Sequence, residues 1–391
     1  MTGLQGAASR RTQRERASER RRAEPRTADH ASGAPPERIL IAGGYGTVGR
    51  RIAALLALDY GPRLVVGGRN MEPAQQLARS LGHGVGAVRI DVNDAHSVQE
   101  AIAGVGVVIS CVRQGAVPHL LEAAVAQGCG YTDMAPMSIR RPPVPRALRE
   151  QAVATGARVI VGAGLVPGLS NMLARQGADA VGPVRSVVVT CLLSLGDEFG
   201  SDSAGYIADE VLTPFSVLVD GRRVKARALQ GAGHARFPPP VGRIRAFRFP
   251  FSDQVGYSES LGARTAYTRI AILPKWTGSV FSVYLALKRG SMGSEKAGGR
   301  ERMARLLEGL KRRYAGVNWW GVRVDMTGER GEHHATFFGR GQADATAVSA
   351  AAFVRALVEG PVDRPGIWSA EQAIPPEMYF SYLAAHGIAE S

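Results

Sequence analysis

Short apolar runs alternate with stretches of helical spacing between residues 37 and 165. The runs are Ile39–Ala42, Arg63–Gly67, Val85–Ile90, Val105–Ser110, Gly128–Asp133 and Arg158–Gly162. Continuous apolar runs are typical of strands buried on both faces, and strands that alternate with helices are joined by right-handed crossovers. We therefore expect an α/β chain whose first domain, residues 37–165, is a Rossmann-type doubly wound parallel sheet.

The pattern changes after residue 165. Val184–Leu195 has the pattern of a strand, and Tyr206–Phe215 and Arg300–Tyr314 have that of helices. More strand-like or mixed pieces follow at Thr265–Leu273, Gly278–Leu287, Val317–Thr327 and Ala335–Gly341. We expect residues 166–341 to form a second, α+β domain for substrate binding and dimerisation. The Ala-rich stretch Asp344–Glu359 predicts that residues 342–391 are a helical segment that packs back on the first domain.

The first apolar run leads into the most informative motif, Gly44-Tyr45-Gly46-Thr47-Val48-Gly49. A helical stretch with Ile52, Leu55 and Leu56 on one face follows at once. In a dinucleotide-binding turn the first glycine allows the tight turn, the second lets the backbone approach a pyrophosphate, and the third lets helix and strand pack closely. The order of strand, turn and helix predicts a nucleotide site at Gly44–Gly49.

The second strand ends at Gly68-Arg69-Asn70, about 20 residues beyond the turn, where an NAD site usually carries Asp or Glu. A carboxylate there would repel a 2′-phosphate, whereas Arg69 is a bidentate donor for one and Asn70 adds an amide. The sequence thus favours NADP over NAD.

The ends of later strands add candidates for the cofactor site. Asp91 and Val92 follow the third strand, and Ser110, Cys111 and Val112 follow the fourth. Because ligands bind at the carboxyl edge of such sheets, these residues can line the nucleotide. Asp91 is equally a candidate helix cap, although Asp94 is better placed for that role.

Four segments together resemble the saccharopine dehydrogenase-like oxidoreductases, which include saccharopine reductase and lysine dehydrogenase. They are the glycine turn, Gly68–Asn70, Gly130–Asp133 and the run Gly162–Asn171, while Gly366–Gln372 and Tyr382–Ile388 are similar to the end of that family. The resemblance implies NAD(P)-linked oxidation or reduction at a carbon bonded to nitrogen, with substrate held between the two domains. It does not transfer a substrate, because the amino-acid-binding residues of the saccharopine enzymes are not visible in the middle of this chain.

Catalysis requires a proton donor beside the reacting heteroatom, because the cofactor supplies the hydride. Tyr131 and Asp133 lie on the expected sheet edge and His119 opens the preceding helix, although each has an ordinary packing or capping role as an alternative. The segments Ser110–Val112, Tyr131–Pro136 and Leu165–Asn171 should converge at the nicotinamide, so Ala135 and Pro167 join the cofactor-binding set. Ser170 and Asn171 can cap the next helix.

Composition narrows the classes of partner. Residues 1–36 carry eight arginines and almost no large apolar side chains, so we expect a disordered basic tail. Three separated cysteines and a His333–His334 pair that points to opposite strand faces predict neither disulfides nor a metal site. No apolar run approaches membrane length. We expect a cytoplasmic homodimer that binds a small molecule and neither nucleic acid nor membrane.

Arg222–Lys275 contains eleven cations and two anions. Such a stretch is either a solvated basic face or a source of positive potential near the cleft for an anionic or carrier-tethered substrate. The function expected is NADPH-dependent hydride transfer at a C=N or C=O carbon. The alternatives are an enoyl (C=C) reductase and a non-catalytic NADP-sensing protein.

Overall fold

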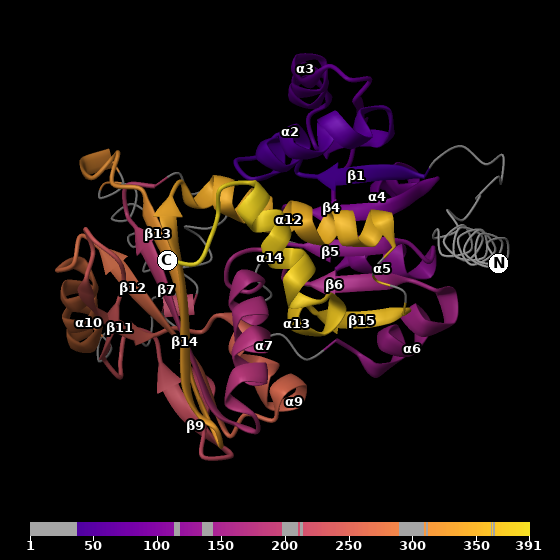
Figure 1. The fold of residues 1–391 in the computed structure, drawn as a ribbon. Coiled ribbons are helices and arrows are strands. Elements are labelled where there is room, and N and C mark those ends of the chain that lie inside the picture. The colour runs from indigo at the N-terminus through magenta and orange to yellow at the C-terminus, as the bar shows by residue number, and fades with distance from the viewer. Residues whose placement is uncertain are drawn as a thin grey trace, which may run out of the picture. The chain divides into compact units, whose positions relative to one another are not determined.

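The computed structural model describes residues 37–112, 118–134, 144–197, 210–211, 214–288, 309, 312–360, 362 and 364–391. Its first sheet is parallel throughout, with the strand order β15-β6-β5-β4-β1-β2-β3 (Figure 1). The elements of its first part are β1 (Arg38–Ala42), α2 (Gly49–Tyr60), β2 (Leu64–Gly68), α3 (Met71–Leu81), β3 (Gly86–Arg89), α4 (Ala95–Ile102), β4 (Val105–Ser110), α5 (His119–Ala126), β5 (Gly130–Asp133), α6 (Arg146–Thr155) and β6 (Arg158–Val161). The doubly wound α/β prediction is confirmed.

The register of this sheet sets the carboxyl edge. Ala42 on β1 is opposite Ser110 on β4, and Ser110 is opposite Asp133 on β5. On the other side of β1, Ala42 is opposite Gly67 on β2. The segments predicted to bind ligand therefore all begin at the same edge of the sheet.

The seventh strand comes from the end of the chain. β15 (Gly366–Ser369) pairs in parallel with β6, and α12 (Gln342–Glu359), α13 (Ala370–Ala373) and α14 (Pro376–Ala385) accompany it. The prediction of returning helices is confirmed, and the segment also contains a strand, β15, that was not predicted. A four-residue strand at the edge of a sheet gives too short a pattern to distinguish it from a loop.

The second sheet has eight strands and mixed directions. Six follow the order β10-β11-β12-β7-β13-β14, and the β8–β9 hairpin joins through β12. The strands are β7 (Val184–Ser194), β8 (Pro214–Val219), β9 (Arg222–Arg227), β10 (Gly233–Arg236), β11 (Arg243–Arg248), β12 (Thr265–Leu273), β13 (Trp319–Gly328) and β14 (Gly331–Arg340). Helix α7 (Leu169–Val181) packs on β13, β14 and β7, and α9 (Tyr257–Leu261) follows a single 3-10 turn at Ser252–Val255.

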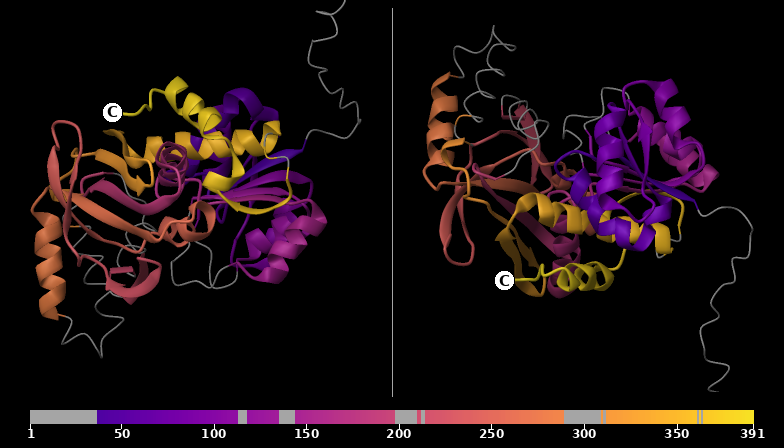
Figure 2. Two further views of the ribbon diagram at one scale, coloured as in Figure 1. Left: turned by 60° about the horizontal axis from the view of Figure 1, so that its bottom comes forward. Right: turned by 90° about the horizontal axis from the view of Figure 1, so that it is seen from above.

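The predictions for two segments of this part differ from the structure. The expected helix Tyr206–Phe215 is helical at Glu210 and Val211, but Phe215 lies in β8, and most of its other residues lie outside the described ones. Gly278–Leu287, expected to be a strand-like or mixed piece, forms α10 (Thr277–Lys288). Helix α10, orange in both views of Figure 2, packs on β11 and β12. It buries Phe281 and Leu285 but leaves Val280 and Val283 exposed, so its sequence shows no clear helical period. The expected helix Arg300–Tyr314 lies mostly outside the described residues, as does the expected basic tail, residues 1–36.

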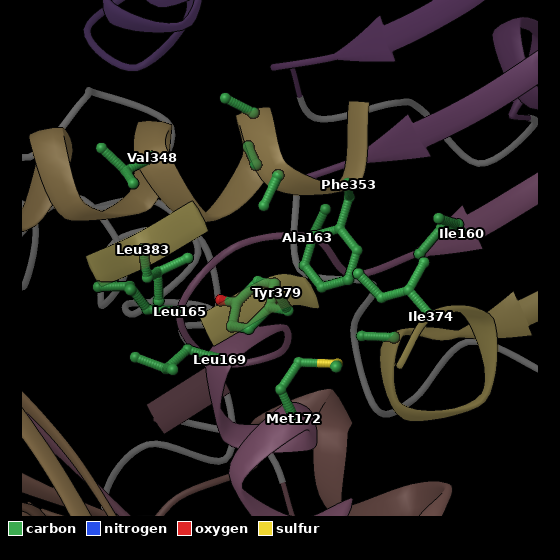
Figure 3. Close-up of a cluster of buried hydrophobic side chains, with 14 of the residues drawn as sticks. Ile160, Ala163, Leu165, Leu169, Met172, Val348, Phe353, Ile374, Tyr379 and Leu383 are labelled. Carbon is green, nitrogen blue, oxygen red and sulfur yellow. The ribbon is translucent and has the colours of Figure 1, made fainter. Parts of the chain in front are cut away.

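One hydrophobic core connects the two sheets. It includes Ile39 and Ile109 of the first sheet, Val187 and Val324 of the second, and Phe353 of α12. Figure 3 shows the part where α7, α12 and α14 meet, with Tyr379 between Leu169, Met172 and Phe353. The loop between β6 and α7 is therefore enclosed by packed side chains from the end of the chain. In the described part of the chain, no helix is long and apolar enough to span a membrane.

Candidate functional site

The glycine turn between β1 and α2 is tight for steric reasons. Gly43, rather than Gly44, has the left-handed backbone, with φ of 78°. A Cβ on Gly44 would lie 2.8 Å from Val66 Cγ1, and one on Gly49 would lie 2.3 Å from the carbonyl oxygen of Gly43. The role given to Gly49 in close helix packing agrees with this geometry, whereas the turn conformation assigned to Gly44 belongs to its neighbour.

The amino end of α2 has free donors. Val48, the residue before the helix, makes no side-chain cap. The backbone N–H groups of Thr47, Val48 and Gly49 form no hydrogen bond with another described residue. Free N–H groups at a helix start bind anions, so these residues fit the pyrophosphate of a dinucleotide.

The end of β2 carries the residues expected to face the ribose. Arg69 and Asn70 are exposed, and Arg69 has no hydrogen bond or ion pair with a described residue. The Tyr45 ring lies so close to Gly68 that a Cβ there would be 2.2 Å from it, and the Tyr45 hydroxyl accepts a hydrogen bond from the Asn70 N–H at 3.3 Å. The exposed Arg89, opposite Gly68 on β3, is a second cation at this edge that sequence reasoning missed.

Asp91 and Asp94 were both candidates for the cap of α4, and the structure assigns this role to Asp94. Asp94 caps α4 by accepting a hydrogen bond from the His96 N–H at 3.0 Å. Asp91 accepts one from the Asn93 N–H at 3.1 Å and remains partly exposed at the sheet edge. Val92 beside it is buried. Asp91 thus stays a candidate for the adenosine end of the cofactor, while Val92 belongs to the core.

Ser110, Cys111 and Val112 lie against the glycine turn. A Cβ on Gly43 would be 2.4 Å from Val112 Cγ1, and the Cys111 N–H donates to the Ala42 carbonyl at 2.9 Å. Ser110 is buried, with its hydroxyl directed to the Val112 carbonyl at 3.3 Å. Burial raises the pKa of the Cys111 thiol far above its ordinary value. This segment supports the turn rather than supplying reactive groups.

A cavity of about 290 Å³ opens beyond the carboxyl ends of β5, β6 and β15; we call it the edge cavity. The first sheet and its helices contribute Asp133, Val144, Arg149, Val161, Gly162, Ile367, Trp368 and Ser369. The remaining lining residues are Pro167, Asn171, Arg223, Ser252, Asp253, Val255, Gly256, Glu259, Ser260, Glu371 and Gln372. Two of the three segments predicted to converge, those of Asp133 and Pro167, meet here.

The expected catalytic residues have different surroundings. Tyr131 is fully buried, with its hydroxyl 3.4 Å from Asp133 Oδ2. Asp133 lines the edge cavity and accepts a hydrogen bond from the Gly162 N–H at 3.0 Å, so it holds the ends of β5 and β6 together. His119 opens α5 and is not among the lining residues. Ala135 lies outside the described residues.

The loop before α7 is held rigidly. Gly168 has a φ of 123°, and a Cβ on it would lie 1.9 Å from the Gly164 carbonyl oxygen. Asn171 Oδ1 accepts a hydrogen bond from the Gly168 N–H at 2.9 Å, which agrees with its expected capping role. The Ser349 hydroxyl of α12 donates to the Gly164 carbonyl at 2.7 Å. Helix α12 therefore helps to fix the loop that carries Pro167 to the edge cavity.

Asp253 is the most unusual group in the edge cavity. Its carboxylate accepts hydrogen bonds from the Thr268 hydroxyl at 2.9 Å, the Gln254 N–H at 3.0 Å and the Tyr257 hydroxyl at 3.2 Å. Burial raises the pKa of Asp253 to about 6, against these bonds and one from Ser170, which lower it. Burial and the neighbouring carboxylates also raise the pKa of Tyr257, which keeps its proton.

Glu371 is a second buried carboxyl in the same cavity. Its Oε2 accepts a hydrogen bond from the Asn171 amide at 2.9 Å, and its Oε1 accepts one from the Ser260 hydroxyl at 2.7 Å. Neither Glu371 nor Asp253 forms an ion pair with a described residue. Sequence reasoning missed both, because they come from segments far apart in the chain and match no local motif.

The basic stretch of the sequence does not gather at the edge cavity. Of its eleven cations, Arg223 is the one that lines this cavity in the described part of the chain. Arg236, Arg243 and Arg269 instead line a separate cavity on the second sheet. Among the described residues, the positive charge of this stretch is therefore not concentrated at the edge cavity.

Comparison with known families identifies the first part of the chain. Residues 39–160 match the model of the saccharopine dehydrogenase NADP binding domain. Residues 39–160 thus have the character of an NADP-binding domain of the saccharopine dehydrogenase type. A search of curated protein sequences found no match.

Two solved structures share the fold of this chain. Saccharopine dehydrogenase (L-Glu forming) from Saccharomyces cerevisiae is 16% identical, with a TM-score of 0.63 over 91% of this chain and 99% of that one. Homospermidine synthase from Legionella pneumophila, in complex with NAD, is 12% identical, with a TM-score of 0.60 over 91% of each chain. At these identities the likeness concerns the fold alone.

Proposed function

We propose that this protein is an oxidoreductase that transfers hydride between NADPH and a carbon bonded to nitrogen, in the edge cavity. The observation that carries the proposal is the pair of buried carboxyls, Asp253 and Glu371. Both face a cavity beside the expected nicotinamide position, and both receive hydrogen bonds from neutral groups alone among the described residues.

The chemistry of these carboxyls favours one substrate class. A buried carboxylate without a cationic partner is unfavourable by several kcal/mol. A protonated imine or amine in the cavity would supply the missing positive charge, and its N–H groups would be donors to the carboxylates. A ketone or an enoyl group is neutral and would leave both carboxylates uncompensated. The arrangement thus supports C=N chemistry over the C=O and C=C alternatives.

The residues of the chain have separate roles in this proposal. NADPH, when bound, supplies the hydride to the imine carbon. Asp253 and Glu371 stabilise the positive charge on the imine nitrogen, and the charge disappears as the C=N π electrons become the amine lone pair. Tyr257 and Asn171 hold the two carboxyls in place. The enclosed loop at Gly168 keeps its neighbours Pro167 and Asn171, which line the cavity, in fixed positions while the reactants are aligned.

The same proposal includes a preference for NADPH over NADH. Arg69 is exposed and unpaired with other described residues at the strand end where the ribose of a dinucleotide lies. A 2′-phosphate would give Arg69 a bidentate partner. The exposed Arg89 on the neighbouring strand adds to the positive charge there.

A matched substrate set tests the chemistry. NADPH oxidation is followed with a 2-oxo acid alone, with the same acid plus an amine that forms the imine in solution, and with an enoyl thioester. We expect turnover that depends on the amine. Asp253→Asn and Glu371→Gln should each lower kcat/KM for the imine by about 30-fold or more, the effect of removing one partner of a buried charge pair. NADPH affinity should be unchanged.

Glu332→Gln is the control, because Glu332 is an exposed carboxyl of the β13–β14 hairpin. It should behave as the wild type does. Two results would contradict the proposal. One is that the Asp253 and Glu371 variants turn over the ketone or the enoyl thioester as efficiently as the wild type does. The other is that the protein binds NADPH but turns over none of the three substrates.

A further inference from the structure

A second cavity, of about 520 Å³, lies on the second sheet; we call it the arginine cavity. Five strands contribute to it: β7, β10, β11, β12 and β13. Its lining residues are Val188, His234, Ala235, Arg236, Arg243, Arg269, Arg323 and Asp325. Four guanidinium groups thus face a space that contains one carboxylate.

That carboxylate, on Asp325, already has a cationic partner. Arg323 Nε lies 2.9 Å from Asp325 Oδ1 and 3.0 Å from Oδ2, so the two side chains form a closed, neutral pair. Arg236, Arg243 and Arg269 form no ion pair with any residue that the structure describes. Among the described residues, the arginine cavity therefore has three positive charges without an anionic partner.

The backbone brings two of these charges together. Arg236 and Arg243 are directly opposite each other in the β10–β11 hairpin, and both are exposed. Like charges at opposite positions of an antiparallel pair destabilise it. Two arginines at this position are favourable when a shared anion lies between them.

Arg269 has a donor without a partner. Arg269 on β12 lies between the β11 strand that carries Arg243 and the β7 strand, where it is opposite Thr190. Its Nε is a buried polar atom with no hydrogen-bond partner among the described residues, although the side chain lines the arginine cavity. Buried polar groups are nearly always paired in folded proteins, so this N–H indicates a missing acceptor.

The Arg269 guanidinium is held in a fixed position. Its Nη2 donates to the Tyr267 hydroxyl at 2.9 Å, and it lies 5.1 Å from the centre of the Tyr267 ring. A Cβ on Gly233 would be 2.8 Å from the guanidinium, so strand β10 approaches closely over it. A held cation with an unpaired N–H is preorganised for an anion.

We propose that the arginine cavity binds a phosphate-bearing small molecule, with the phosphate between Arg236, Arg243 and Arg269. A doubly charged tetrahedral phosphate can accept from several guanidinium forks at once, whereas a carboxylate needs only one. This site is separate from the nucleotide site, which is predicted at Gly44–Gly49 beside the first sheet. The proposal does not depend on the proposed function.

Titration calorimetry with inorganic phosphate tests the site in full-length protein saturated with NADPH, so that the nucleotide site is filled. Wild-type protein should show saturable binding. The double variant Arg236→Ala/Arg243→Ala should weaken it by at least 10-fold, and Arg269→Met should do the same. The matched control is Arg222→Ala/Arg227→Ala, which removes the same charge from exposed positions on β9 outside the cavity. It should change the affinity less than 2-fold.

Three results would overturn the assignment. One is an absence of saturable binding by wild-type protein. Another is an equal loss in the control, which would indicate general charge attraction. The third is concentration-dependent self-association that the Arg236/Arg243 variant weakens while phosphate has no effect, because the partner of the cations would then be a second copy of the chain.

Discussion

At the scale of single residues, Asp253 carries the strongest conflict between burial and charge. It is 3% exposed, and its hydrogen-bond partners are two hydroxyl groups, a backbone N–H and the nearby Ser170. Desolvation is the larger effect and raises its pKa to about 6. A carboxyl with a raised pKa in the folded state holds its proton where the unfolded chain has lost it.

This raised pKa predicts how stability changes with pH. Between about pH 4 and pH 6 the folded state binds the Asp253 proton and the unfolded state does not, so the free energy of unfolding should fall as pH rises. The decrease should reach about 3 kcal/mol and level off above the folded pKa. Asp253→Asn should lack this component.

Denaturant titrations from pH 4 to pH 7 measure the effect. The Asn variant should gain stability relative to the wild type across this range, whereas Glu332→Gln should run parallel to the wild type. Parallel curves for Asp253→Asn would show that Asp253 titrates normally.

Arg69 gives a prediction for the nucleotide. Arg69→Ala should weaken NADPH binding by about 10- to 100-fold and NADH binding little, since a hydrogen bond to a charged group contributes about 1.5–3 kcal/mol. Calorimetry with both nucleotides measures this, with Arg79→Ala on the exposed side of α3 as the control. Equal losses for NADPH and NADH would assign Arg69 to some other role.

The role of a residue could be predicted from the sequence where one local motif determines that role. The turn at Gly44–Gly49 and the Asp94 cap depend on neighbours within a few residues, so the sequence contains the necessary information. Asp253 and Glu371 are 118 residues apart and meet only through the fold. Neither composition nor periodicity can bring such residues together.

At the scale of elements, the loop from β6 to α7 is the most constrained segment near the edge cavity. Leu169 N–H and Ser349 Oγ both donate to the Gly164 carbonyl, at 3.0 and 2.7 Å. Gly168 passes over the same carbonyl at a distance that leaves no room for a side chain. Helix α7 can begin at Leu169 because hydrogen bonds pair backbone polar groups of both the preceding loop and the first turn of the helix.

Gly168→Ala should therefore destabilise the protein by more than about 3 kcal/mol, because backbone strain and a direct clash add together. Gly221→Ala is the matched control: Gly221 also has a left-handed backbone, with φ of 77°, but a Cβ there meets nothing within 4 Å. It should destabilise by about 1 kcal/mol. Denaturant unfolding measures both, and similar values would show that the loop relaxes.

Elements with strong periodicity were predicted well, and elements decided by tertiary contacts were not. Val105–Ser110 and Thr265–Leu273 form strands with the expected bounds. Strands β9, β10 and β11 of the basic stretch were missed, since their arginines interrupt the apolar pattern. Helix α10 was misread because its exposed side also carries valines.

At the scale of the whole molecule, the first sheet is assembled from both ends of the chain. β15 pairs with β6, Arg355 of α12 forms an ion pair with Asp59 of α2 at 2.5 Å, and Ser349 bonds to Tyr379 at 2.6 Å. The second sheet is thus inserted between β6 and the elements that complete the first. The two parts cannot be separated by one cut in the chain.

Deletion of residues 366–391 should consequently lower Tm by more than about 10 °C or prevent soluble expression, because it exposes β6 and the core around Tyr379. Deletion of residues 1–36, which have few large apolar side chains, should leave Tm unchanged. Thermal unfolding of both truncated proteins makes the comparison. A stable protein without residues 366–391 would show that the first sheet is complete without β15.

The late arrival of β15 also matters during synthesis on the ribosome. Between the end of β6 and the start of β15, about 200 residues must be translated, which takes roughly 10–40 s at about 5–20 residues per second. During that time the edge of β6 that later pairs with β15 is unpaired, and the apolar surface that α12 and α14 later cover is exposed. The nascent chain is therefore exposed to aggregation or chaperone binding until β15 and α14 emerge.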